Sequence, residues 1–176
     1  MFFQKKTESL IIAEKLIKKV DLDENLKLLK QKNHTGTVEP DEFLNLILAL
    51  GTCNLVQTMK ADFIQEKLQP ALQYEITRDY VKESLDRQKL IKIKSAEAEE
   101  KFYAVMRIVS ELQMFWKESE DPTDGGPGPR YYCVKEILKR IGGETNYELH
   151  DALFELMYLQ HKNYIDFFKG RLVKPA

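Results

Sequence analysis

The sequence predicts a mostly α-helical fold with short β-strands, in which two similar units follow an N-terminal helical extension. The prediction depends on a pattern that occurs twice, at 77–94 and at 145–168. Each copy begins with a threonine that can cap a helix, continues with apolar residues at helical spacing, and ends in a strand-like run. A shorter amphipathic helix precedes each copy, at 61–69 and at 133–141. The expected divisions of the 176-residue chain are the extension, the first unit and the second unit, at 1–38, 39–95 and 96–176.

The composition is that of a chain with a substantial core and a charged surface. Apolar residues make up 43% of the chain and charged residues 31%. Because the formal charge is −1, any nucleic-acid contact requires a local basic face. Cys53 and Cys133 stand alone and far apart, which favours free buried thiols in a reducing compartment. No apolar stretch approaches the roughly 20 residues of a membrane span, so we expect a cytoplasmic protein without membrane contact.

The N-terminal part of the chain is expected to form three helices. Residues 7–20 carry apolar side chains on one stripe, and Thr7 is a suitable cap. Residues 21–31 form a second, shorter helix. Pro40 and the acidic residues beside it favour the start of a helix, which we expect over 41–58. Because this third helix is apolar on most sides, it is expected at the centre of the core.

In the first unit, the helix at 61–69 is expected to end at Pro70, and a turn at 71–76 leads to the third helix of the unit at 77–88. Residues 90–94 alternate apolar and charged side chains, as a half-buried strand does. The next segment is ambiguous, since residues 102–107 would suit a returning strand. However, apolar residues step by three and four, which favours one long helix at 96–118 joining the two units. The predicted buried side of this helix consists of Phe102, Val105, Val109 and Leu112.

The second unit contains a segment rich in proline and glycine, at 121–129, which is expected to be a mobile loop. A helix at 134–141 follows, and the pair Gly142 and Gly143 is expected to stop it. The remaining expected elements are a helix at 146–160 and strands at 163–168 and 171–174.

Through this order of helix, turn, helix and strand, the chain resembles the winged-helix superfamily, over 41–94 and again over 96–174. The resemblance implies two winged-helix units in tandem and DNA binding in transcription control or in plasmid or phage DNA transactions. It implies double-stranded DNA as a partner, with the helix at 77–88 in the major groove, where basic side chains pair with phosphates and guanine edges. The candidate DNA-binding residues are Arg78, Lys82, Arg87, Lys89, Lys92 and Lys94.

An alternative interpretation of these basic residues is an ordinary solvated helix surface with charges of both signs. The matching helix of the second unit is acidic, because Glu148, Asp151 and Glu155 share one face that a phosphate backbone would repel. These acids serve solubility. If DNA is bound, the second unit docks against a partner or a second copy, or leaves the DNA contact to the upstream residues Arg130, Lys135, Lys139 and Arg140. Most aromatic residues near the C terminus are expected in the core, and Tyr164 and Phe168 are candidates for a self-association patch.

No catalytic or metal-binding constellation is visible, so the sequence predicts neither an enzyme nor a cofactor. The segment 21–25 resembles the opening of a calcium loop, but Leu26 stands where glycine is required and Lys32 where a bidentate glutamate belongs. Two function hypotheses follow. One is a DNA-binding protein, and the other is a protein–protein adaptor whose N-terminal helices at 7–31 dock to a partner. Salt-dependent retention on duplex DNA would distinguish the two.

Overall fold

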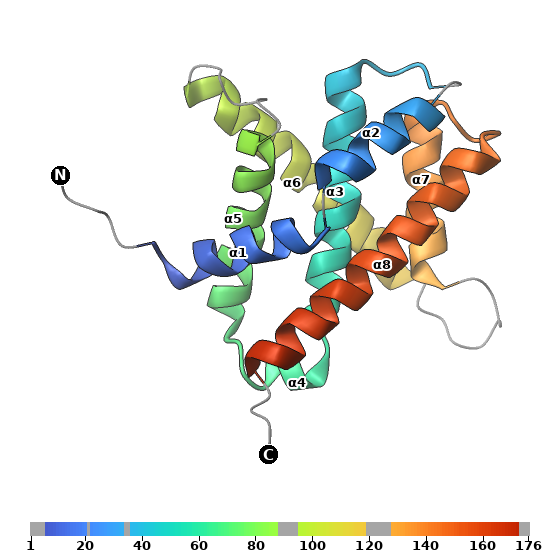
Figure 1. Cartoon of the computed structure of the whole chain (residues 1–176). Helices are drawn as coiled ribbons and strands as arrows, with labels where there is room; N and C mark the ends of the chain where they lie inside the picture. Colours follow the sequence, from blue (N-terminus) through green and yellow to red (C-terminus); the bar gives the residue numbers. More distant parts are fainter. Residues whose placement is uncertain (1–5, 21, 34–35, 88–94, 119–127, 173–176) are drawn as a thin grey trace.

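The computed structural model describes residues 6–20, 22–33, 36–87, 95–118 and 128–172. Within these ranges the fold is all-α, with eight helices and no β-strand (Figure 1). The helices are α1 (Glu8–Val20), α2 (Leu22–Lys32), α3 (Pro40–Thr58), α4 (Asp62–Gln65), α5 (Pro70–Arg87), α6 (Ser95–Glu118), α7 (Pro129–Ile141) and α8 (Tyr147–Leu172).

The central element is α3, as its apolar sequence predicts. It begins at Pro40 with Asp41 and Glu42 in its first turn, where acidic side chains favour the positive end of the helix dipole. It contacts α5, α6, α7 and α8, and most of its side chains are buried (Figure 1). The buried apolar residues of all these helices form one connected cluster, which sets the positions of the outer helices.

The first helix, α1, packs across α5 and α8. A buried polar contact fixes it on α5, because the Ser9 hydroxyl donates to Asp79 Oδ2 at 2.6 Å. Two contacts join α1 to α8. Asn163 Nδ2 of α8 donates to the Lys19 carbonyl of α1 at 3.3 Å, and Arg171 of α8 pairs with Glu8 of α1 at 2.8 Å. These two contacts show that α1 and the C-terminal half of α8 run antiparallel.

The turn between α7 and α8 confirms the predicted stop. Gly142 has φ 76°, a left-handed conformation that favours glycine, and the Gly143 amide donates to the Leu138 carbonyl at 2.8 Å. The cap of α8 is Asn146 rather than the predicted Thr145, since the Asn146 side-chain oxygen accepts the Leu149 amide at 3.0 Å.

The sequence interpretation of the helices is confirmed in several places. The helices expected at 7–20, 21–31 and 41–58 are α1, α2 and α3 to within a few residues. The long helix expected at 96–118 is α6. Its four predicted inward residues are all buried, with at most 9% of their surface exposed. Apolar spacing of three and four over six turns therefore decided the ambiguous segment correctly.

The prediction of a β-wing in the second unit is wrong. Residues 163–168, expected as a strand, and 171–172 at the start of the other expected strand all belong to α8. Along this helix the buried residues step by three and four through Leu149, Leu153, Met157, Gln160, Tyr164 and Phe168. The helical period continues past residue 160, so a short alternation of apolar and polar residues was misleading.

The helix-turn-helix prediction for the first unit is also wrong. Pro70 begins α5 instead of ending a helix, and Thr77 lies in mid-helix, where its hydroxyl donates to the Gln73 carbonyl at 2.9 Å. The helix expected at 61–69 is reduced to the four residues of α4. The strand expected at 90–94 and the loop at 121–129 lie outside the described residues. The repeated pattern therefore does not correspond to two winged-helix units.

Candidate functional site

The structure places the predicted DNA-contact residue Arg78 in a network of α1 and α5. Its Nε and Nη2 atoms both donate to Asp79 Oδ1 at 3.1 Å, and the other Asp79 oxygen accepts the Ser9 hydroxyl. Asp79 is only 8% exposed. Because a buried carboxylate needs a partner of opposite charge, Arg78 compensates the charge of Asp79 at the α1–α5 contact, while 37% of the Arg78 side chain stays exposed.

The other predicted contact residues that the structure describes are Lys82 and Arg87, and both are exposed. The Lys82 ammonium lies 5.3 Å from the centroid of the Phe102 ring on α6, where a cation is attracted by the aromatic face. Arg87 is exposed in the last turn of α5. Lys89, Lys92 and Lys94 lie outside the described residues.

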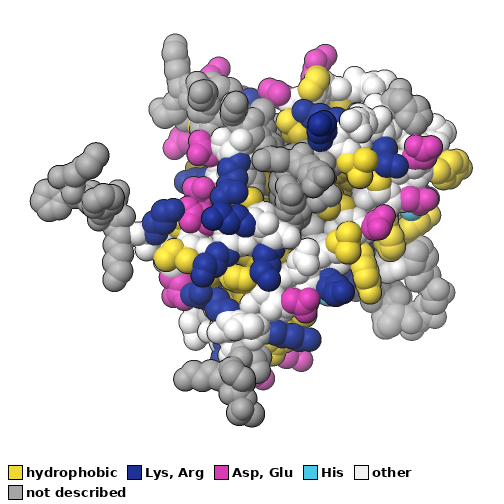
Figure 2. Space-filling model, viewed as in Figure 1, with side chains coloured by type: hydrophobic (Ala, Val, Ile, Leu, Met, Phe, Trp, Pro, Cys, Tyr) yellow, Lys and Arg dark blue, Asp and Glu magenta, His cyan; other side chains and the backbone are white. Residues whose placement is uncertain are grey.

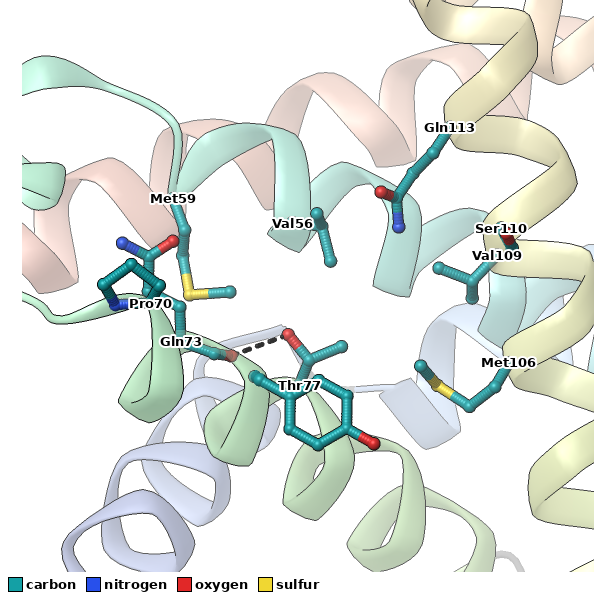
Figure 3. A pocket seen from close by; sticks show the side chains of 10 residues that line it. Val56, Met59, Pro70, Gln73, Thr77, Met106, Val109, Ser110 and Gln113 are labelled. Atoms are coloured by element: carbon teal, nitrogen blue, oxygen red, sulfur yellow. Dashed lines mark hydrogen bonds between the residues drawn. The ribbon is translucent and has the colours of Figure 1, made fainter.

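A groove of about 370 Å³ lies between α3, α5 and α6 (Figure 3). Met59 and Met106 point into it from opposite sides, and Val56 and Val109 complete its apolar floor. Tyr74 stands at its mouth, with 62% of its surface exposed. The remaining lining residues are Pro70, Gln73, Thr77, Ser110 and Gln113.

The chemistry of this groove suits binding rather than catalysis. Its polar lining consists of amides and hydroxyls, and two of these are already engaged. Gln73 Nε2 donates to the Leu68 carbonyl at 2.9 Å, and the Thr77 hydroxyl donates to the Gln73 carbonyl. Tyr74 is the single titratable residue among the lining side chains. Methionine thioethers adapt to varied apolar shapes, so the groove can accommodate apolar side chains of a ligand.

A second polar cluster connects α3, α7 and α8. Arg130 Nε donates to Asn54 Oδ1 at 3.2 Å, and its guanidinium lies 5.3 Å from the centroid of the Trp116 ring. Asn54 Nδ2 donates to the Met157 carbonyl at 2.7 Å. The Thr58 hydroxyl and His161 Nδ1 are 2.8 Å apart. Burial, and then the nearby Arg130 charge, lower the pKa of His161. The cluster therefore favours the uncharged imidazole and ties α3, α7 and α8 together.

The two cysteines, which stand far apart in the sequence, meet in the structure. Cys53 on α3 and Cys133 on α7 are both free and fully buried. A side-chain hydrogen bond with Cys133, followed by burial, raises the pKa of the Cys53 thiol far above its usual range. A protonated, buried thiol is a poor nucleophile. The expectation of free buried thiols is met, but the two side chains are neighbours rather than isolated.

The outer face of α8 carries several exposed aromatic residues. The predicted self-association candidates Tyr164 and Phe168 are fully buried, whereas Tyr147 is 79% and Tyr158 62% exposed. Phe154 is 40% exposed. Figure 2 shows apolar and acidic side chains over the N-terminal half of α8, and lysines and arginines over α1 and the C-terminal half of α8. The predicted acidic residues Glu148, Asp151 and Glu155 are all exposed there.

Sequence reasoning missed the groove and the polar cluster because each assembles side chains from three helices. No local motif marks either of them. The exposed aromatic residues of α8 were missed for a different reason. Tyr147, Phe154 and Tyr158 lie within the helix that the sequence predicted at 146–160, but most of the aromatic residues near the C terminus were assigned to the core.

Comparison with known proteins adds no family to this picture. No family model, curated protein or solved structure matches the chain. None of the described helices is long and apolar enough to cross a membrane. Among the described residues, no three histidine, cysteine, aspartate or glutamate side chains come together in a way that could hold a metal ion.

Proposed function

We propose that this chain is a non-enzymatic adaptor that binds an amphipathic helix of a partner protein in the groove between α5 and α6. The groove itself is the observation that carries the proposal. It is open and mostly apolar, and one of its sides is formed by the largely buried helix α3. Amphipathic helices recognise such grooves by inserting a few apolar side chains from one face.

The dimensions of the groove favour a short helical ligand. Its lining on α5 extends from Pro70 to Thr77, and its lining on α6 from Met106 to Gln113. Each wall is therefore two helical turns, or about 10 Å, long. A ligand helix lying between two such walls would present two or three apolar side chains at spacings of three and four. The amides of Gln73 and Gln113 would border the polar side of the ligand.

The experiment is a selection of amphipathic helical peptides from a display library on the immobilised full chain. The informative variant is Ser110→Trp, which places an indole in the mouth of the groove. The matched control is Arg107→Trp, on the same helix and exposed, but outside the lining. Selected peptides are expected to bind the wild type and the control with similar affinity, and to bind Ser110→Trp at least about tenfold more weakly.

Two results would contradict the adaptor proposal. One is a selection that enriches no peptide, and the other is a set of peptides whose binding is unaffected by Ser110→Trp. Circular dichroism and the urea midpoint of each variant show whether the fold is retained, so a loss of binding can be assigned to the groove.

Duplex DNA remains the second candidate partner, and a specific surface favours it. Lys15, Lys18 and Lys19 on α1 are exposed, as are Lys162 and Lys169 on the adjoining half of α8 (Figure 2). If this surface binds DNA, replacing the three α1 lysines by alanine should reduce the slope of log affinity against log salt by about 0.9 for each lost phosphate contact. An absence of duplex binding at low salt would exclude this candidate.

A further inference from the structure

The outer face of α8 is exposed along its whole length, and it has a symmetric charge pattern. Glu148, Glu155, Lys162 and Lys169 are seven residues apart and all exposed. Seven residues correspond to about two helical turns, so these side chains follow one line on the surface. The line is acidic at its N-terminal end and basic at its C-terminal end, and about 30 Å separate its first and last members.

None of these four charges has an ion-pair partner within the described part of the chain. Two apolar residues flank the middle of this line, because Tyr158 is 62% and Leu159 48% exposed. Exposed aromatic and aliphatic side chains at the centre, bordered by charges, are the composition expected of a protein–protein interface.

We propose that this face binds a second copy of the chain, with the two α8 helices antiparallel across a twofold axis between Tyr158 and Leu159. In that arrangement, position 155 lies opposite position 162 of the other copy, and position 148 lies opposite position 169. Each opposed pair then combines a glutamate with a lysine. A twofold axis makes every such contact twice, so the charge line is complementary to itself.

The charge pattern selects the antiparallel orientation. In a parallel, in-register pair, each glutamate would meet a glutamate and each lysine a lysine, and like charges directly opposite each other are unfavourable. The same axis places Tyr147, 79% exposed, opposite Gly170. A side-chain carbon built on Gly170 would meet nothing within 4 Å, so there is space for a tyrosine ring at that position. The same axis also places Asp151 opposite Asp166, and both are exposed. This unfavourable like-charge pair is made twice, whereas glutamate–lysine pairs are made four times, so the antiparallel orientation keeps the better charge balance.

The dimer surface is separate from the groove proposed for the partner helix. The groove is lined by α3, α5 and α6 and contains no residue of α8. One protein can therefore form the dimer and hold a ligand at the same time, and the dimer proposal does not depend on the adaptor function.

The experiment measures the dimer dissociation constant of the full chain by sedimentation at several concentrations. The wild type is expected to dimerise reversibly, and more weakly as salt is added, since exposed charges are screened. Glu155→Lys makes both positions of an opposed pair positive, and Lys162→Glu makes both negative. Each single variant is expected to raise the dissociation constant about tenfold, because two attractive pairs become repulsive.

Two combinations separate this arrangement from a general loss of stability. Mixing the Glu155→Lys chain with the Lys162→Glu chain brings opposite charges together at both contacts between positions 155 and 162. A heterodimer should therefore form at concentrations at which neither variant forms a homodimer. The double variant carrying both changes exchanges the lysine and the glutamate within each opposed pair. Each pair stays attractive, so this variant should dimerise like the wild type. Glu99→Lys, an exposed change on α6, is the matched control and should have no effect.

A wild-type chain that stays monomeric at all concentrations would overturn the proposal. It would also be overturned by a wild-type dimer that persists unchanged in the single variants, because a different surface would then hold the two copies together.

Discussion

The buried hydroxyl pair of Tyr80 and Tyr164 provides the sharpest test of the packing between α5 and α8. The two phenol oxygens are 2.8 Å apart, and the rings meet edge to face with centroids 6.3 Å apart. Neither residue has any exposed surface. Each hydroxyl therefore has the other as its hydrogen-bond partner and no access to water.

Replacing either tyrosine with phenylalanine leaves the other hydroxyl buried without this partner. Tyr80→Phe and Tyr164→Phe are each expected to lower the free energy of unfolding by about 1–3 kcal/mol, the cost of one unsatisfied buried polar group. The double variant removes both hydroxyls and keeps both rings, so its cost should be about that of one single variant or less. The coupling energy between the two positions is then about 1–3 kcal/mol.

The assay is urea unfolding of the wild type, both single variants and the double variant, followed by circular dichroism. With a slope of about 2 kcal/mol per M, each single variant should lower the unfolding midpoint by about 0.5–1.5 M. If the double variant instead loses the sum of the two single effects, the hydroxyls do not interact and the reasoning is refuted.

Two further predictions concern buried titratable groups. Burial raises the pKa of Tyr80 to about 12, above the ordinary value near 10 of the unfolded chain. As the pH rises, the Tyr80 hydroxyl therefore loses its proton in the unfolded chain before it does so in the folded chain. The contribution of the protonated Tyr80 hydroxyl to the free energy of unfolding is complete below about pH 10 and is lost as the pH rises toward 12. Urea midpoints between pH 9 and 12 would measure this decline, and Tyr80→Phe should reduce it. Cys53 and Cys133 should react with a thiol reagent about 10³-fold or more slowly in the native chain than in urea, because the reagent reaches them only after opening. Rapid reaction of either thiol in the native chain would show that α3 and α7 separate easily.

Sequence periodicity predicted the helices that have an uninterrupted apolar stripe or a clear stop signal. Residues 96–118 carry apolar side chains at spacings of three and four over six turns, and no β-strand can bury such a set on one side. The stop after α7 was predictable because only glycine adopts a left-handed conformation without strain, and Gly142 does so. The apolar character of 41–58 likewise located the central helix.

Short patterns were ambiguous because their meaning depends on neighbours. Residues 163–168 suit a strand when considered alone, but Asn163 contacts α1 and Tyr164 contacts Tyr80 of α5, and a continuous helix buries Tyr164 and Phe168 together. Thr77 has the chemistry of a helix cap, yet in mid-helix its hydroxyl bonds to a carbonyl one turn earlier. Local propensity could not decide between these alternatives.

The sequence by itself determined that the chain folds around an apolar central helix, that its surface is charged, and that α8 carries acidic residues on one face. The tertiary structure alone decided which side chains meet. It placed Met59 and Met106 on opposite sides of one groove, and it turned Arg78 toward the buried Asp79. Side-chain periodicity specifies the face of a helix, but contacts between helices depend on crossing positions that no single segment encodes.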